Sequence, residues 1–374
     1  MGIAMFEKRR KHFVGIAALF VLYSVLAVRP VPPETVLVPK WLSSLESGEP
    51  IRLGDGQLRA AAYEPLPFVL GSRFGYVGPD GRFSLNRTKT GRVSIARGRW
   101  AEFGAMPGGI TVYDGSGAEL KVIDAPDGYP FFLDGRTFVI GSGQSSVSEI
   151  DPSGAVSWTF EFPSPLTSID AAAGLLLAGS VDGVAVVVDG FGRQVFSFDP
   201  GGSRFSVILG TAISADGSRL AIVSGIDSQR FLVLERFGAG LGDYRVVYHE
   251  FLGEGFRRPV HVAFVENDGR IVFERRGGLG IYDVGSRITR NVEVEGELRA
   301  LDGSGGQGLM FAVFSNGPSA GGAMDLVGIQ VSGRAARVVT RAPFRSGEVF
   351  LGRMGSRLIV GGGQALIAFD LEKR

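Results

Sequence analysis

The clearest pattern in the chain is a series of short apolar runs separated by glycine and aspartate. The stretch 165–200 holds four of them, at 166–170, 175–178, 184–188 and 194–198. Each run is short, is rich in β-branched or aromatic side chains and ends at a turn residue, as strands in antiparallel hairpins do. Four such strands in about 36 residues are typical of one blade of a β-propeller.

This unit repeats along the chain, and its first landmark is a turn of the form D-x-x-G that we place between the third and fourth strands. Successive copies begin 36 to 48 residues apart, a spacing that propeller blades share. The copies lie at Gly78/Gly81, Asp114/Gly117, Asp151/Gly154, Asp189/Gly192, Glu235/Gly238, Asp283/Gly285 and Gln330/Gly333, with a last Asp370 near the end of the chain.

A second landmark alternates with the first and marks the turn between the first two strands of a unit. It occurs as LDGRTFVIG, ADGSRLAIV, NDGRIVFER and MGSRLIVGG, at 133–141, 215–223, 267–275 and 354–362. Asp-Gly between apolar runs is a strong hairpin signal. We therefore predict an all-β fold, a single propeller of four-stranded antiparallel blades over residues 51–374. The landmarks give eight blades, or seven if the degenerate first unit (57–86) is not a blade.

The last unit stops after its third strand, so we expect another part of the chain to complete it. Its strands are predicted at 348–351, 357–360 and 365–369, and only five residues follow. A propeller closes by pairing one chain end into the blade of the other, which removes an open sheet edge. The alternating run at 35–38 (TVLV), inside a Pro-rich spacer at 29–50, is the best candidate for that strand.

The N-terminus has the pattern of an export signal. Residues 1–12 form a basic head with Lys8, Arg9, Arg10 and Lys11, and 13–28 is an uncharged apolar run that predicts one helix. This order places the head in the cytoplasm and the remainder outside. We expect an uncleaved transmembrane anchor in a bacterial inner membrane, with the propeller in the periplasm. The alternative is a leader cleaved after Ala27, which leaves a soluble periplasmic protein.

The composition excludes several classes of site and of partner. The chain of 374 residues contains no cysteine, which excludes disulfides, thiolate catalysis, iron–sulfur clusters and cysteine-based zinc sites. Its formal net charge is +1, so no global field attracts nucleic acid, and we expect no nucleic-acid partner. Three histidines are scattered through the sequence, and no nucleophile, zinc or phosphate-loop motif occurs in its proper context.

One segment carries a family resemblance. VSEIDPSGAVSWTFEF at 147–162 resembles the repeat of pyrroloquinoline-quinone-type propellers, in which a strand ends in D-x-x-G and a Trp follows four residues later; Asp151, Gly154 and Trp158 match. The turn at 216–220 is similar to that of WD-type repeats. The resemblance implies the quinoprotein-like propeller superfamily. Its dehydrogenases hold the quinone with a stacked Trp, a Cys pair and a calcium ion, so the missing cysteines favour a branch with no cofactor.

Two sets of repeated residues could carry chemistry, but each has a more ordinary interpretation. The acids Asp114, Asp151, Asp189, Asp283 and Asp370 could bind metal, yet their recurrence at one place in each unit favours turn formation. Trp158 and Phe196 could stack a ligand, although large aromatic side chains at a repeated position more often fill the gap between neighbouring blades.

Within the predicted propeller, the one local concentration of charge is a set of arginines in a single predicted blade. Such a run can be a solvated face, or it can bind an anionic partner. Its members are Arg257, Arg258, Arg275, Arg276, Arg287 and Arg290.

From these observations we expect a membrane-anchored propeller of the cell envelope that binds or scaffolds a protein partner and is not an enzyme. Two alternatives stay open. One is a periplasmic enzyme that uses the axial cleft of the propeller with a quinone or a metal, and the other is a small-ligand sensor.

Overall fold

The computed structural model describes residues 35–54, 63–104, 109–123, 128–253, 255–304, 306, 308–317, 322–332 and 335–373. The predicted head, the predicted membrane segment and the start of the spacer lie outside the described residues. Within the described ranges no helix has the length and apolarity needed to cross a membrane. The chain divides into two compact units, and the larger, Val38–Asp370, holds the blades described below.

The stretch that defines the repeat forms one four-stranded blade. Its strands are β14 (Leu166–Ala172), β15 (Leu175–Ser180), β16 (Ala185–Val188) and β17 (Gln194–Phe198), paired in sequence order and antiparallel. The two central strands are fully buried, as expected for β-branched and leucine side chains between two neighbouring sheets. The four predicted strands are therefore confirmed to within two residues at each end.

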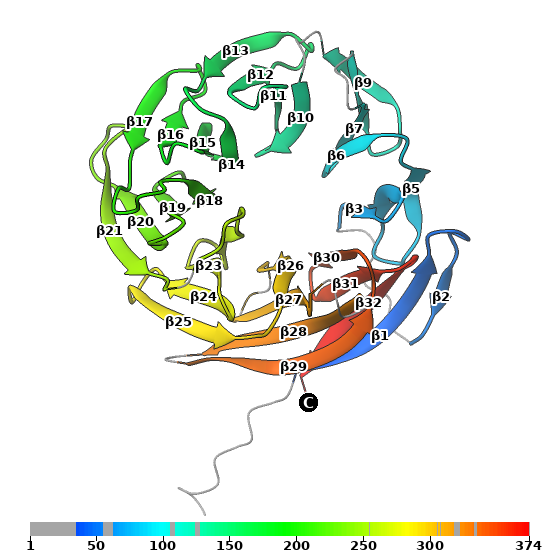
Figure 1. Ribbon diagram of the computed structural model, residues 1–374. Helices are drawn as coiled ribbons and strands as arrows, with labels where there is room; N and C mark the ends of the chain where they lie inside the picture. Colours follow the sequence, from blue (N-terminus) through cyan, green and yellow to red (C-terminus); the bar gives the residue numbers. More distant parts are fainter. Residues whose placement is uncertain are drawn as a thin grey trace, which may run out of the picture. The chain divides into compact units, whose positions relative to one another are not determined.

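The other four-stranded blades repeat this order, and Figure 1 shows them following one another around a ring, with β10, β14 and β18 toward the centre and β13, β17 and β21 outside. Their strands are β6 (Arg92–Ala96), β7 (Arg99–Phe103), β8 (Ile110–Asp114) and β9 (Glu119–Ile123); β10 (Gly128–Leu133), β11 (Arg136–Gly141), β12 (Ser146–Ile150) and β13 (Val156–Glu161); β18 (Ile208–Ile213), β19 (Arg219–Ser224), β20 (Arg230–Arg236) and β21 (Tyr244–Phe251); β22 (Val262–Val265), β23 (Arg270–Arg275), β24 (Gly278–Asp283) and β25 (Ile288–Glu293); β26 (Glu297–Asp302), β27 (Leu309–Ser315), β28 (Ala323–Ser332) and β29 (Ala335–Arg345).

The first and last blades depart from four strands, and together with the others they make eight. The first has three, β3 (Leu66–Leu70), β4 (Arg73–Val77) and β5 (Phe83–Thr88). Its Gly78/Gly81 turn thus joins the second strand to the third, one strand earlier than predicted, and the unit still counts as a blade. The last has five, ordered β2 (Pro50–Arg52), β1 (Thr35–Ser44), β32 (Ala365–Lys373), β31 (Arg357–Gly362) and β30 (Val349–Met354).

The predicted closing strand is confirmed, because β1 lies next to β32 in the last sheet and begins at Thr35. It is longer than predicted and carries Trp41 into the core with 2% of its surface exposed, and Leu45, in the turn directly after the strand, is 1% exposed. The indole Nε1 of Trp41 donates a 2.9 Å hydrogen bond to the carbonyl oxygen of Pro79 in the first blade. Strand β1 therefore joins the last blade to the first.

The repeated turn aspartates cap their own turns. The Oδ1 of Asp151 accepts hydrogen bonds from the backbone N–H of Ser153 at 2.8 Å and of Ala155 at 3.0 Å, and Asp114 binds Ser116 and Ala118 in the same way. Asp370 differs, since it lies in β32 and forms an ion pair with Arg357 at 2.7 Å. Asp189 accepts in the same way from the backbone N–H of Phe191 and Arg193, and Asp283 from that of Ser286. The turn interpretation of the repeated acids thus holds for Asp114, Asp151, Asp189 and Asp283 and not for Asp370.

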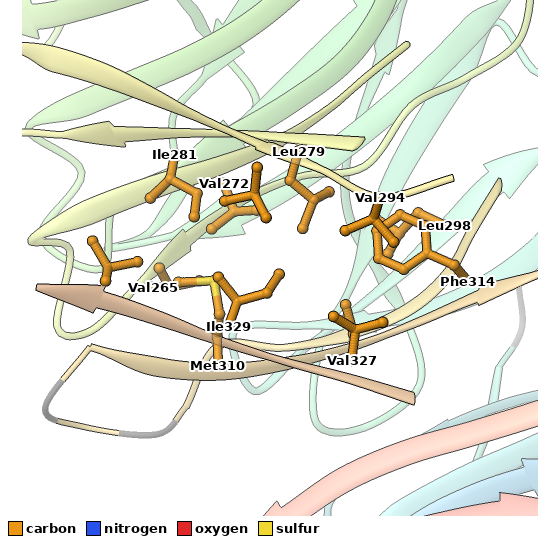
Figure 2. Packing of buried hydrophobic residues seen from close by; sticks show 13 residues of the cluster. Val265, Val272, Leu279, Ile281, Val294, Leu298, Met310, Phe314, Val327 and Ile329 are labelled. Carbon is orange, nitrogen blue, oxygen red and sulfur yellow. The ribbon is translucent and has the colours of Figure 1, made fainter. Parts of the chain in front are cut away.

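The cores lie between neighbouring blades. Figure 2 shows one of them, in which Val272, Leu279 and Ile281 of one sheet pack against Met310 and Ile329 of the next. Trp158 occupies a similar place on β13, where its ring packs so closely on Gly192 of the following blade that a Cβ there would lie 2.8 Å from the indole Cγ. Phe196 likewise contacts Tyr244 of the next blade, with ring centroids 5.2 Å apart. Both aromatic residues thus fill gaps between blades.

Candidate functional site

Four of the six predicted arginines lie at one end of the β23–β24 hairpin, and the other two lie elsewhere in the same blade. In the β23–β24 pair, Arg275 lies opposite Gly278 at one end and Arg270 opposite Asp283 at the other. The β23–β24 turn carries Arg276, and the connection into β22 carries Arg257 and Arg258 beside it. We call Arg257, Arg258, Arg275 and Arg276 the arginine patch.

The remaining two arginines serve other contacts. Arg287, in the β24–β25 turn, forms a 3.2 Å ion pair with Glu235 of the preceding blade. Arg290 lies in the middle of β25, opposite Ile281, and its charge is one of the factors that lower the pKa of Asp283. The structure therefore does not bring Arg287 and Arg290 to the patch.

Within the patch, Arg258 is held by a buried carboxylate. Its two terminal nitrogens contact the two oxygens of Glu274 at 2.6 and 3.1 Å, and its Nε lies 3.4 Å from Glu297. Glu274 is only 2% exposed, and hydrogen bonds to it raise the pKa of the Arg258 guanidinium. A bidentate pair of this kind fixes the orientation of the arginine.

A single aromatic ring supports two of the patch guanidinium groups. The Cζ atoms of Arg258 and Arg276 lie 4.5 and 5.5 Å from the ring centroid of Phe256, within the range of cation–π attraction. Arg276 also donates from Nε to the carbonyl oxygen of Gly255 at 3.2 Å. The ring thus holds two positive charges near each other at the surface.

The other two patch arginines have no acidic partner among the described residues. Arg257 is exposed. Arg275 is partly buried, and its Nε is buried without a hydrogen-bond acceptor in the described part of the chain. An unpaired guanidinium favours an anionic group from outside, since its buried N–H lacks an acceptor.

Reasoning from the sequence missed the acidic side of this region. Glu274 neutralises Arg258 from the adjacent strand, and Glu293 and Glu295 border a groove next to Arg275 and Arg276. The only signal in the sequence was the presence of acids near the arginines, which does not say which charges meet.

A separate pocket of 610 Å³ lies where the starts of β6, β10 and β14 meet, on the inner side of three neighbouring blades. Phe103, Tyr129 and Phe131 line it, and the guanidinium of Arg92 lies 5.4 Å from the ring centroid of Tyr129. Among the described residues, no three His, Asp or Glu side chains are arranged to hold a metal ion.

Comparison with solved structures gives the same architecture. BamB from Moraxella catarrhalis matches with a TM-score of 0.58 and 14% identity, over 90% of this chain and 98% of that one. The computationally designed protein Ika8 also matches at 0.58, with 14% identity over 83% of this chain and 98% of that one. A chain of a mitotic checkpoint complex matches with a TM-score of 0.51 and 14% identity, over 86% of this chain and 97% of that one. At this identity the likeness concerns the fold.

Comparison with other sequences defines the family. An uncharacterized protein from Treponema pallidum (strain Nichols) is 28% identical over 293 residues, which cover 76% of each chain. A family described as beta-propeller protein matches residues 5–373, nearly the whole sequence. The chain therefore belongs to this family of β-propeller proteins.

Proposed function

We propose that this protein is an exported, membrane-anchored propeller of the cell envelope that binds an acidic protein partner through the arginine patch and carries out no catalysis of its own. The observation that carries the proposal is the position of four arginines at one end of the β23–β24 hairpin, of which only Arg258 has acidic partners among the described residues.

The physical consequence of this arrangement is a local positive potential on a nearly neutral protein. Charges at the rim of an interface steer encounter and select partners more than they add affinity, and their effect weakens with salt. Fixing Arg258 on Glu274 and Arg276 on Phe256 lowers the entropy lost when a partner's carboxylates bind.

The similar structures lend support to a binding role. One of them comes from a structure of the mitotic checkpoint complex, so a propeller chain of similar fold takes part in an assembly there.

Membrane attachment is supported by the sequence, in which the basic head precedes the apolar run 13–28. Alkaline phosphatase fused after residue 50 is expected to be active, and the protein is expected to stay in the membrane pellet after a carbonate wash. A soluble product that begins at Val28 would contradict the anchor.

The partner is tested with the full-length protein in membranes. We compare chemical cross-linking to neighbouring proteins in the wild type, in Arg257→Gln/Arg276→Gln and in the control Arg82→Gln, whose side chain is 74% exposed on the first blade. The double variant is expected to lose one cross-linked species that poly-glutamate also competes away, and the control keeps it. Equal cross-linking in all three would refute the role of the patch.

Arg258 is left intact in this experiment for a physical reason. Its removal would leave the Glu274 carboxylate buried and unpaired, which costs about 3 kcal/mol or more and would confuse binding with stability.

The small-ligand alternative is favoured by one observation, the 610 Å³ pocket with its three aromatic side chains. Its volume and mixed lining are typical of small-molecule sites. A compound that raises the melting temperature of the wild type in a thermal-shift screen, but not that of Tyr129→Ser, would support that alternative.

A further inference from the structure

A groove leads from the arginine patch into the space between the sixth and seventh blades. It has a volume of 760 Å³ and is lined by Arg275, Arg276 and Gly277 of the sixth blade and by Val338 and Arg341 of β29 in the seventh. A second hollow of 480 Å³ is also lined by Glu295 and Arg341, so these two residues border both spaces.

The connection from β25 to β26, which lines the second hollow, lies close to the seventh blade. Gly296 has a φ of 107°, and a Cβ at this position would lie 2.5 Å from the carbonyl oxygen of Ser315. Only glycine fits such a backbone. The chain therefore turns tightly from β25 into β26 where it borders the second hollow.

Charges of both signs line the groove, and the strand pairing places them relative to each other. Arg275 on β23 lies opposite Gly278 on β24, which lies opposite Glu293 on β25, and Arg276 and Glu295 follow these two residues closely in the sequence. Neither glutamate forms an ion pair with a described residue, and the Nε of Arg275 is buried without an acceptor among them. Further along, Arg341 pairs with Asp325 at 3.0 Å and is already neutralised. The unpaired charges thus change from positive on β23 to negative on β25, across three neighbouring strands of one sheet.

We propose that this groove binds an extended segment of the partner, with an acidic side chain at Arg275 and Arg276 and a basic side chain at Glu293 and Glu295. This inference rests on the proposed function and adds the class of peptide that is recognised. The order of charges explains the choice, because a purely acidic segment would meet Glu293 and Glu295 with repulsion. Val338, which is 40% exposed, offers an apolar contact in the same groove.

The experiment measures fluorescence anisotropy of labelled octapeptides on the full-length protein in detergent. The probes are Glu-Thr-Glu-Thr-Lys-Thr-Lys-Thr, its reversed sequence, an all-Glu version and an all-Thr version. We expect one of the two mixed peptides to bind about tenfold more tightly than the all-Thr peptide, and the affinity to fall with added salt.

Variants then assign the ends of the peptide. Glu293→Lys/Glu295→Lys is expected to weaken the mixed peptide about tenfold and to strengthen the all-Glu peptide. Arg275→Gln/Arg276→Gln is expected to weaken both, and Arg82→Gln to change neither. Tight binding of the all-Glu peptide alone by the wild type would overturn the inference, as would equal binding of all four peptides.

The two proposals fail separately. If Arg257→Gln/Arg276→Gln abolishes the cross-link in membranes but Glu293→Lys/Glu295→Lys changes neither the cross-link nor peptide binding, the acidic partner stands and the groove is wrong. If the cross-link survives the arginine variants, the proposed function itself is wrong.

Discussion

Closure of the ring can be tested by removing one side chain of β1. Trp41 is 2% exposed, donates to the carbonyl oxygen of Pro79 at 2.9 Å and packs on Gly81, where a Cβ would lie 2.7 Å from the indole Cδ2. Arg357 of β31 donates to the same Pro79 oxygen at 2.6 Å and pairs with Asp370. The first and last blades are thus held together by two side chains that meet at one carbonyl group.

The expected magnitude follows from these contacts. Trp→Ala at a fully buried position costs about 3–5 kcal/mol through lost burial and the cavity that remains. Trp41→Phe keeps an aromatic ring but loses the hydrogen bond, and this loss is expected to lower the free energy of unfolding by about 1 kcal/mol. Removal of residues 1–50 takes away all of β1 and leaves β32 with an open edge, so its cost exceeds that of Trp41→Ala. Because the net stability of a protein is only about 5–15 kcal/mol, this deletion is expected to unfold much of the ring.

The assay is thermal unfolding by circular dichroism on soluble variants. Taking the version that lacks residues 1–33 as reference, Trp41→Ala is expected to lower the Tm by about 5–10 °C. Ile51→Ala, at a position that is 61% exposed in β2, is expected to change it by no more than about 1 °C. Equal melting temperatures for the versions that lack 1–33 and 1–50 would refute closure through β1.

Two further predictions concern the repeat itself. Trp158→Ala is expected to destabilise by about 2–4 kcal/mol, since the half-buried ring packs on Gly192 and its Nε1 donates to Glu149 at 2.7 Å; unchanged stability with a binding defect would instead indicate a ligand contact. Hydrogen bonds from Ser214 and Ser218 lower the pKa of Asp216 to about 2. The contribution of this carboxylate to folding stability is therefore fully present above the pKa that Asp216 has in the unfolded chain, and it is lost as the pH falls toward 2. Denaturant unfolding should therefore show Asp216→Asn less stable than the wild type at pH 7 and equal to it near pH 2, and a constant difference would contradict this assignment.

The sequence by itself determined the fold of this protein to a large extent. Strand positions such as 166–170 and 194–198, the hairpin turns and the closing strand at 35–38 follow from local rules, because alternation and turn chemistry depend on residues only a few positions apart. The repetition of these signals then gives eight blades. The interblade place of Trp158 followed for the same reason, since a repeated position meets a repeated environment.

The tertiary structure decided which charges are paired and which are free. Arg258 meets Glu274 sixteen positions away, and Arg357 reaches Pro79 across 278 positions, so composition along the chain could not show either pair. For the same reason the six arginines of one predicted blade separate into a patch of four and two residues with other contacts. Asp370 joins ring closure instead of a turn because the chain supplies β1, and no further hairpin, beside β32. Whether a charge is neutralised depends on distances of a few ångström between strands, and only the folded arrangement sets these distances.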